Sequence, residues 1–377
     1  MADRSQLSAL GATLALALHL AAGLVPRTGL AASETAGAAQ LPRGADYVIP
    51  NYQFASGETL PELRVHYTTL GKAHRDARGR VDNAVLILHG TGGSGHSFLV
   101  DRFAQVLFGK GQLLDANRYY IILPDAIGHG ASSKPSDGLH ARFPHYNFED
   151  MVAAQYALLT QGLQVDHLRL LLGTSMGCMH SWMWAERYPA FVDAYMPLAC
   201  LPVAIAGRNR IWRGLIMDAI RSDPQWLEGE YRSEPMGALR TAAGIFLIAG
   251  SAPIEMQIAL PTREAADHFR EEYMDREMAG LDANDVLYQL DASRNYDPSN
   301  GLDRITARVM WINSADDFIN PAELGIAERE IKRVKNGRFV LLPASEQTHG
   351  HGTHTWAAVW QEYLRELLAA SEPKTGG

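Results

Sequence analysis

One short stretch constrains the fold most: the apolar run 170–172 leads directly into Gly173-Thr174-Ser175-Met176-Gly177, and a helical pattern follows. Glycines on both sides of Ser175 let the backbone turn sharply, so the serine side chain stands at the start of the helix. The run is short, continuous and apolar, as in a strand that is buried on both faces. The stretch therefore predicts a strand–turn–helix unit of a parallel sheet.

The rest of the chain repeats this alternation of apolar runs and amphipathic stretches, which is typical of an α/β fold with a mostly parallel sheet flanked by helices. The predicted strands are 63–70, 84–88, 119–123, 168–172, 194–198, 309–312 and 339–342. The predicted helices include 148–162, with Asn147 as its N-cap, and a closing helix at 355–370.

The alternation stops between residues 202 and 300, where helical patterns with Trp and Met and several Gly and Pro breaks predict an α-helical insertion. Ligands of open α/β sheets bind outside the carboxyl ends of the strands, so we expect this insertion to act as a lid. The predicted organisation is a leader at 1–39, a core in two parts at 40–201 and 301–377, and the lid at 202–300.

The first forty residues resemble a bacterial-type signal peptide. Arg4 precedes an Ala/Leu-rich run at 10–25, and small residues follow at 29–32 and 36–39. We expect cleavage between about residues 31 and 39 and a periplasmic or secreted protein without stable membrane association. An uncleaved N-terminal anchor helix is the alternative.

The charges and the cysteines exclude several classes of function. The formal net charge is −8, and 34 basic and 42 acidic residues are interspersed, which predicts no nucleic-acid partner. The two cysteines, Cys178 and Cys200, have no metal-ligand spacing. A bridge between them is one option, but both adjoin segments predicted to be buried, so we expect free thiols in the core. We expect no metal and no cofactor.

A serine hydroxyl needs a base and an orienting acid to become a nucleophile, and after a turn like that at Ser175 they follow in the order Asp, then His. Asp316 and Asp317 both come directly after the predicted strand 309–312. We favour Asp317, four residues before Pro321, as the acid. Asp316 would then be solvated or brace the loop.

The base is expected in the loop after the last strand, which contains His349, His351 and His354. Glycines flank His351 and leave its ring free to point into a site, so His351 is the predicted base. The other two are predicted to be surface or supporting groups, because their spacing is a weak metal-ligand pattern.

An oxyanion hole requires two backbone N–H donors. Met176, directly after the serine, is the first predicted donor, and Gly90 or Thr91 in the Gly-rich segment after strand 84–88 is the second. That segment lacks the Lys-Ser/Thr ending of a phosphate-binding loop. His89 is predicted to be a hydrogen-bonded histidine at the strand end, and Asp125 is the weaker candidate for the acid.

Several stretches together resemble the homoserine O-acetyltransferase branch of the α/β-hydrolase superfamily and its hydrolase-like relatives. They are Phe143-Pro144, 150–155, 173–177, Trp184-Ala185, Tyr188-Pro189, 213–220 and 223–226. The resemblance covers nearly all of the chain after the leader. It implies Ser175 as nucleophile, Asp317 as acid, His351 as base, and an acyl-enzyme formed in a ping-pong sequence.

Three departures from that branch favour hydrolysis. Members of the branch carry Asp after the catalytic His, where this chain has Gly352, and the segment 125–132 resembles ordinary hydrolases. The predicted export also separates the chain from cytosolic acetyl-CoA. We therefore predict a carboxylic-ester hydrolase acting on a small ester. The alternatives are an O-acyltransferase that uses acyl-CoA and, less favoured, a non-catalytic ligand-binding protein. A homodimer is left open.

Overall fold

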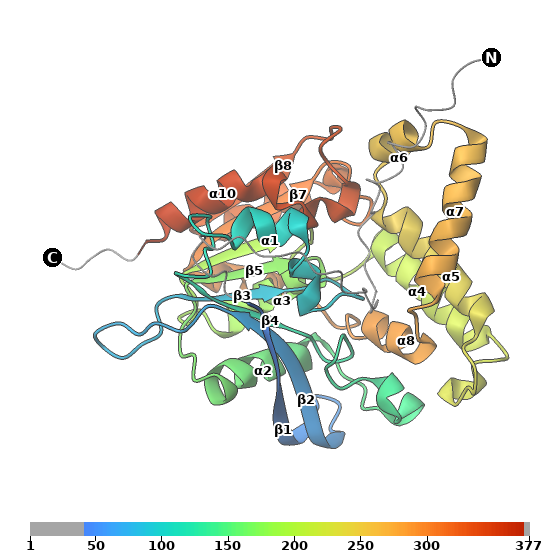
Figure 1. Cartoon of the computed structure of the whole chain (residues 1–377), viewed down its shortest axis with the longest axis horizontal. Coiled ribbons are helices and arrows are strands. Elements are labelled where there is room, and N and C mark those ends of the chain that lie inside the picture. Colours follow the sequence, from blue (N-terminus) through green and yellow to red (C-terminus); the bar gives the residue numbers. More distant parts are fainter. Residues whose placement is uncertain (1–40, 373–377) are drawn as a thin grey trace, which may run out of the picture.

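The computed structural model describes residues 41–372, and the predicted signal peptide lies outside them. A single eight-stranded sheet with the order β1-β2-β4-β3-β5-β6-β7-β8 forms the centre of the molecule (Figure 1). The strands are β1 (Arg43–Gln53), β2 (Thr59–Leu70), β3 (Ala84–Leu88), β4 (Tyr120–Pro124), β5 (Leu170–Thr174), β6 (Ala194–Leu198), β7 (Arg308–Ser314) and β8 (Gly337–Leu342). From β4 to β8 all neighbours are parallel, which confirms the predicted fold class.

Strand β1 is the only one of these strands that the sequence pattern did not predict. It pairs antiparallel with β2, from Arg43 opposite Thr69 to Gln53 opposite Thr59, at the edge of the sheet. Most of its side chains are exposed, whereas every residue of β3 and β5 is buried. A strand that buries so little leaves no apolar run in the sequence.

Helices cover both faces of the sheet. On one face α1 (Asp101–Leu107) and α10 (Ala357–Ala370) pack together, with the rings of Phe103 and Trp360 5.7 Å apart. On the other face lie α2 (Phe148–Ala157) and α3 (Met176–Arg187). The short α9 (Ile326–Glu330) connects β7 to β8. The predicted N-cap of α2 is confirmed, because Oδ1 of Asn147 accepts a hydrogen bond from the Asp150 amide over 3.1 Å.

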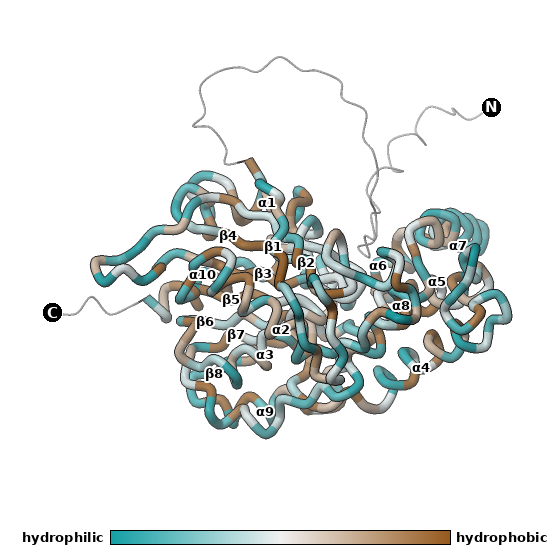
Figure 2. The backbone as a smooth tube through the Cα atoms, turned by 90° about the horizontal axis from the view of Figure 1, so that it is seen from below, coloured by the Kyte–Doolittle hydropathy of each residue, from teal (hydrophilic) through white to brown (hydrophobic). Residues whose placement is uncertain are grey.

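Five helices occupy the interval between β6 and β7: α4 (Gly207–Ser222), α5 (Met236–Gly250), α6 (Pro253–Ala259), α7 (Arg263–Met278) and α8 (Ala283–Asp291). They gather beside the sheet as a separate group (Figure 1). Figure 2 shows apolar residues concentrated on the central strands, whereas the outer helix α7 is mainly hydrophilic. In residues 41–372 no single helix is long and apolar enough to cross a membrane. Helices α5 and α6 reach the required length and apolar character only when taken together, and they are bent by 104° relative to each other.

The cysteines form a disulfide, so the expectation of free thiols was wrong. Cys178 lies in α3 and Cys200 lies two residues beyond β6, and their Cα atoms are 5.8 Å apart. Both side chains are buried, as predicted, but packing α3 against β6 places them within bonding reach. The bridge ties the helix that follows Ser175 to the neighbouring strand.

Candidate active site

Ser175 occupies a strained turn between β5 and α3. Its backbone has φ +52° and ψ −111°, a region that residues with a Cβ rarely adopt. A Cβ at Gly173 would lie 2.0 Å from the Gly177 carbonyl oxygen, and a Cβ at Gly177 would lie 2.1 Å from the Leu88 carbonyl oxygen. Both flanking positions therefore require glycine, as the sequence pattern indicated.

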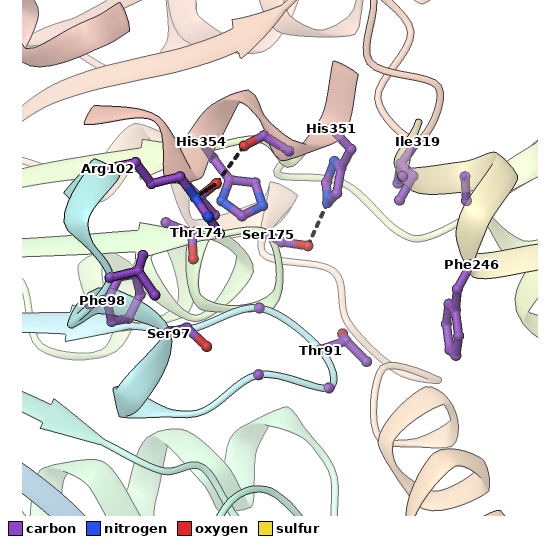
Figure 3. Close-up of a pocket in the computed structure, with 18 of the residues that line it drawn as sticks. Thr91, Ser97, Phe98, Arg102, Thr174, Ser175, Phe246, Ile319, His351 and His354 are labelled. Carbon is purple, nitrogen blue, oxygen red and sulfur yellow. Dashed lines mark hydrogen bonds between the residues drawn. The ribbon is translucent and has the colours of Figure 1, made fainter. Parts of the chain in front are cut away.

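Ser175, His351 and Asp317 come together from the ends of three segments far apart in the chain. Oγ of Ser175 lies 2.8 Å from Nε2 of His351 (Figure 3). Nδ1 of the same ring lies 2.9 Å from Oδ2 of Asp317. With the proton on Nδ1 donated to Asp317, Nε2 is free to accept the serine proton. The geometry suits nucleophilic catalysis, and the catalytic roles of the three residues stay a prediction.

The carboxylate of Asp317 is held rigidly and ionised. Its oxygens also accept hydrogen bonds from the backbone of Ile319 at 2.8 Å and from Nδ2 of Asn320 at 2.9 Å. Burial acts to raise the pKa of Asp317, but the charge of His351 and these hydrogen bonds outweigh it and lower the pKa below its usual value. An ionised Asp317 can orient the His351 ring and stabilise its protonated form.

Asp316 contacts a different part of the histidine loop. Its Oδ2 accepts hydrogen bonds from Oγ1 of Thr348 at 2.8 Å and from the Gly350 amide at 3.2 Å. Its other oxygen accepts a hydrogen bond from Ser314. Asp316 therefore braces the loop that carries His351, which is one of the two roles expected for it.

The segment after β3 lies against the serine. A Cβ at Gly90 would lie 3.1 Å from Cβ of Ser175, and Thr91 lines the same cavity as the serine. Met176 is the first residue of α3, where backbone N–H groups have no partner within the helix. The structure thus brings all three predicted oxyanion donors to the vicinity of Ser175.

His89 and Asp125 hold the surrounding loops together. Nδ1 of His89 donates to the Gly90 carbonyl at 2.8 Å, and its Nε2 accepts from the Ala126 amide at 3.0 Å. Burial lowers the pKa of His89, so the ring stays neutral as this bonding requires. Asp125 accepts hydrogen bonds from the amides of Gly95 and Ala131. Neither residue contacts His351 through a hydrogen bond.

The two other loop histidines are largely buried supporting groups. Nδ1 of His349 lies 2.9 Å from Oε1 of Glu255 in α6, and its ring stacks on Trp356 at 4.0 Å. The His354 ring meets the His351 ring edge-on at 5.2 Å, and burial lowers the pKa of His354 to about 3. Within residues 41–372 no group of three His, Cys, Asp or Glu side chains could hold a metal ion.

A small cavity of about 100 Å³ opens at Ser175 between the core and the insertion. Figure 3 places Arg102 and His354 on one side of the serine, and Phe246 and Ile319 on the other. The core side also includes Ser97, Phe98, Val100 and Thr355, and the insertion supplies Trp212, Arg213, Phe246, Ala249 and Gly250. No local sequence pattern marks these wall residues, because they reach the site from elements that are distant in the chain.

The chain is similar to known proteins over most of its length. The family described as alpha/beta hydrolase fold matches residues 83–346. A homoserine O-acetyltransferase of Geobacter sulfurreducens is 30% identical over 362 residues, covering 83% of this chain and 94% of that protein. A probable acyltransferase of Methanothermobacter thermautotrophicus is 30% identical over 279 residues, covering 74% of this chain and 84% of that protein.

Solved structures show the same fold. An acetylester hydrolase from Corynebacterium glutamicum has a TM-score of 0.75 at 20% identity, covering 87% of this chain and 96% of that one. A homoserine O-acetyltransferase from Bacillus anthracis has a TM-score of 0.76 at 20% identity, covering 90% of this chain and 100% of that one. Solved structures of a hydrolase and of a transferase therefore share the fold of this chain.

Proposed function

Because the chain belongs to the alpha/beta hydrolase fold family, with homoserine O-acetyltransferases and esterases among its relatives, we propose that it is a carboxylic-ester hydrolase acting through Ser175. The observation that carries the proposal is the continuous set of hydrogen bonds from Ser175 through His351 to Asp317 at the cavity. The cavity is small, which suits a short acyl group.

The proposed reaction has two halves. In the first, Nε2 of His351 takes the proton of the Ser175 hydroxyl while Oγ attacks the ester carbonyl carbon. The amides of Met176 and of Gly90 or Thr91 stabilise the negative oxygen of the tetrahedral intermediate. His351 then gives the proton to the leaving alkoxide, and the acyl group stays on Oγ.

In the second half, His351 removes a proton from a water molecule as the water oxygen attacks the acyl carbon. Collapse of the second tetrahedral intermediate breaks the bond to Oγ, and the proton returns from His351 to Ser175. The carboxylic acid leaves and the free enzyme is restored. Asp317 stays ionised throughout and stabilises the protonated ring.

Water is the proposed acceptor because the cavity offers no anionic side chain to hold the amino group of an amino acid. The resemblance to the transferases implies an aspartate after the histidine, where this chain has Gly352. Among the described residues that line the cavity there is no aspartate or glutamate. The amino group of a homoserine acceptor would therefore lack an anionic partner.

An O-acyltransferase is the second candidate, and the names of the relatives favour it. Those at about 30% identity include homoserine O-acetyltransferases and a probable acyltransferase. In this reaction an alcohol would take the place of water in the second half, and the insertion would act as a lid that keeps water out.

We also propose that the chain works in the periplasm or outside the cell. The sequence at 1–39 resembles a signal peptide, and disulfides such as Cys178–Cys200 persist mainly in oxidising compartments. Export would remove the chain from acetyl-CoA and thereby supports hydrolysis over transfer.

Treatment with a fluorophosphonate followed by peptide mass spectrometry tests the nucleophile. We expect an adduct on Ser175 that is absent in Ser175→Ala and retained in Ser97→Ala, a serine on the same cavity wall. An unlabelled wild-type protein would refute both the hydrolase and the transferase.

The rate of 4-nitrophenyl acetate hydrolysis is then compared with the rate of acetyl transfer from acetyl-CoA to homoserine. Fast transfer with negligible hydrolysis would establish the second candidate, the O-acyltransferase, instead.

A further inference from the structure

We propose that the substrate carries a carboxylate, which the guanidinium groups of Arg213 and Arg102 bind inside the catalytic cavity. This inference rests on the proposed function and narrows its substrate class to anionic esters. The two arginines line the same cavity as Ser175, one from the insertion and one from the core.

Arg213 is a buried cation without an anion. Its side chain is on α4 and is only 4% exposed. Nε donates to Oδ1 of Asn209 at 2.9 Å and Nη1 donates to Oγ of Ser293 at 3.3 Å, so both partners are neutral. Among the described residues no carboxylate forms an ion pair with Arg213. Burial and the charge of Arg210 lower the pKa of Arg213 only to about 10, so the guanidinium remains charged at neutral pH.

Arg213 differs from Arg169, the other buried arginine, in the partners of its guanidinium group. These are the two arginines below 9% exposure in the described chain. Arg169 donates to the Leu368 carbonyl at 2.7 Å and to Ser371 at 2.9 Å, at the C-terminal end of α10, where the helix dipole is negative. Arg169 does not line the catalytic cavity. Arg213 instead has two neutral side-chain partners and the ring of Trp212, whose centre lies 4.7 Å from its guanidinium carbon, and it lines the cavity.

Arg102 supplies a second positive charge on the core side of the serine (Figure 3). Its Nε donates to Oγ1 of Thr355 at 3.3 Å, and its guanidinium lies 5.6 Å from the centre of the Trp356 ring. Within residues 41–372 it also has no ion pair with a carboxylate. Burial lowers the pKa of Arg102, which reflects a partly desolvated charge.

Together these residues make the cavity wall cationic. Burying a charge without a counter-ion is costly, and the cost is recovered when an anion enters the same space. A guanidinium also has the planar fork that matches a carboxylate, so two N–H groups can donate to its two oxygens. The wall contains no aspartate or glutamate that would repel such a group.

The carboxylate could belong to the acyl part or to the alcohol part of the ester, and paired substrates separate the two. Monomethyl succinate is compared with methyl succinamate for the acyl part, and 4-acetoxybutyrate with 4-acetoxybutyramide for the alcohol part. Each pair differs only in carboxylate against carboxamide. For wild type we expect kcat/KM at least about tenfold higher for the anionic member of one pair, the range expected for a charge-assisted hydrogen bond.

The variants are Arg213→Gln and Arg102→Gln, with Arg221→Gln as a control that removes the same charge from an exposed position on α4. We expect the preference to fall at least about fivefold in the first two and to stay unchanged in the control. The urea-unfolding midpoint of each variant, compared with that of wild type, reports whether the variant is folded. Equal kcat/KM within both pairs in wild type, or a preference that survives in both variants, would overturn the inference.

Calorimetry with Ser175→Ala separates this inference from the proposed function. This variant should bind monomethyl succinate or 4-acetoxybutyrate more tightly than the matching amide, and Ser175→Ala/Arg213→Gln should not. A wild type that cleaves none of the esters while Ser175→Ala keeps this discrimination refutes the hydrolase and supports the anion site. If the wild type hydrolyses the esters but neither assay distinguishes carboxylate from carboxamide, the hydrolase is supported and the anion site is refuted.

Discussion

Oδ2 of Asp317 lies 2.9 Å from Nδ1 of His351, whereas the adjacent carboxylate of Asp316 bonds to Thr348 and Gly350 in the same loop. Two consecutive acidic residues thus have separate tasks: one orients the ring and the other braces the segment that carries it. The separation follows from the different hydrogen-bond partners of the two adjacent carboxylates just after β7.

The two carboxylates can be distinguished by matched substitutions. We expect Asp317→Asn to lower kcat/KM for a short ester by a factor on the order of 10³–10⁴, because the amide disfavours the tautomer that accepts the serine proton. Asp316→Asn keeps an acceptor oxygen for Thr348 and should cost less than about tenfold. A larger loss of kcat/KM in Asp316→Asn than in Asp317→Asn would identify Asp316 as the acid instead of Asp317.

The glycine after the serine should tolerate no side chain. A Cβ at Gly177 would meet the Leu88 carbonyl oxygen at 2.1 Å, so Gly177→Ala should lower the free energy of unfolding by about 2 kcal/mol or more and abolish turnover. Gly214 in α4 is the control, because a Cβ there has nothing within 4 Å. Gly214→Ala should stabilise by about 0.5–1 kcal/mol in urea unfolding. Equal effects of the two substitutions would contradict the close packing at the turn.

The disulfide should contribute substantially to stability. It closes a loop with a sequence separation of 22, so Cys178→Ala/Cys200→Ala should lower the free energy of unfolding by about 3 kcal/mol. Alkylation of the unfolded, unreduced wild-type protein should label no thiol, and reduction should expose both. Labelling of either cysteine without reduction would show that the bridge does not form.

Buried histidines should make the protein sensitive to mild acid. Burial lowers the pKa of His180 to about 3, and Nδ1 of this ring accepts a hydrogen bond from Gln155. The fold therefore needs neutral His180, whereas the unfolded chain takes up a proton below about pH 6.5. The contribution of neutral His180 to the free energy of unfolding is fully present above that pH. It falls by about 1.4 kcal/mol per pH unit as the pH drops from about 6 towards 3.

Urea unfolding between pH 7 and pH 4 measures this dependence. His180→Leu should reduce the slope of the unfolding free energy against pH by about 1.4 kcal/mol per pH unit, which corresponds to one proton. His268→Leu changes an exposed histidine of α7 and should leave the slope unchanged. The same slope in wild type and His180→Leu would show that the buried ring is not the source.

Local sequence patterns were enough to predict much of the fold and the centre of the site. The turn at Ser175 follows from glycines that stand next to it, and the strands from β2 to β8 follow from short apolar runs. The helical insertion follows from the loss of that alternation. The meeting of Ser175, Asp317 and His351 follows from their places in the loops after β5, β7 and β8. Each of these signals lies within a few residues of the feature that it predicts.

Other features depend on which distant segments pack together. The Cys178–Cys200 bridge, the contact between Glu255 and His349, and the place of Arg102 and Arg213 in one cavity join residues from separate elements. Strand β1 is defined by its pairing with β2, because its side chains are mostly exposed. Residue type and spacing set the backbone turn that presents Ser175; long-range packing sets the charge and shape of the cavity that the serine faces.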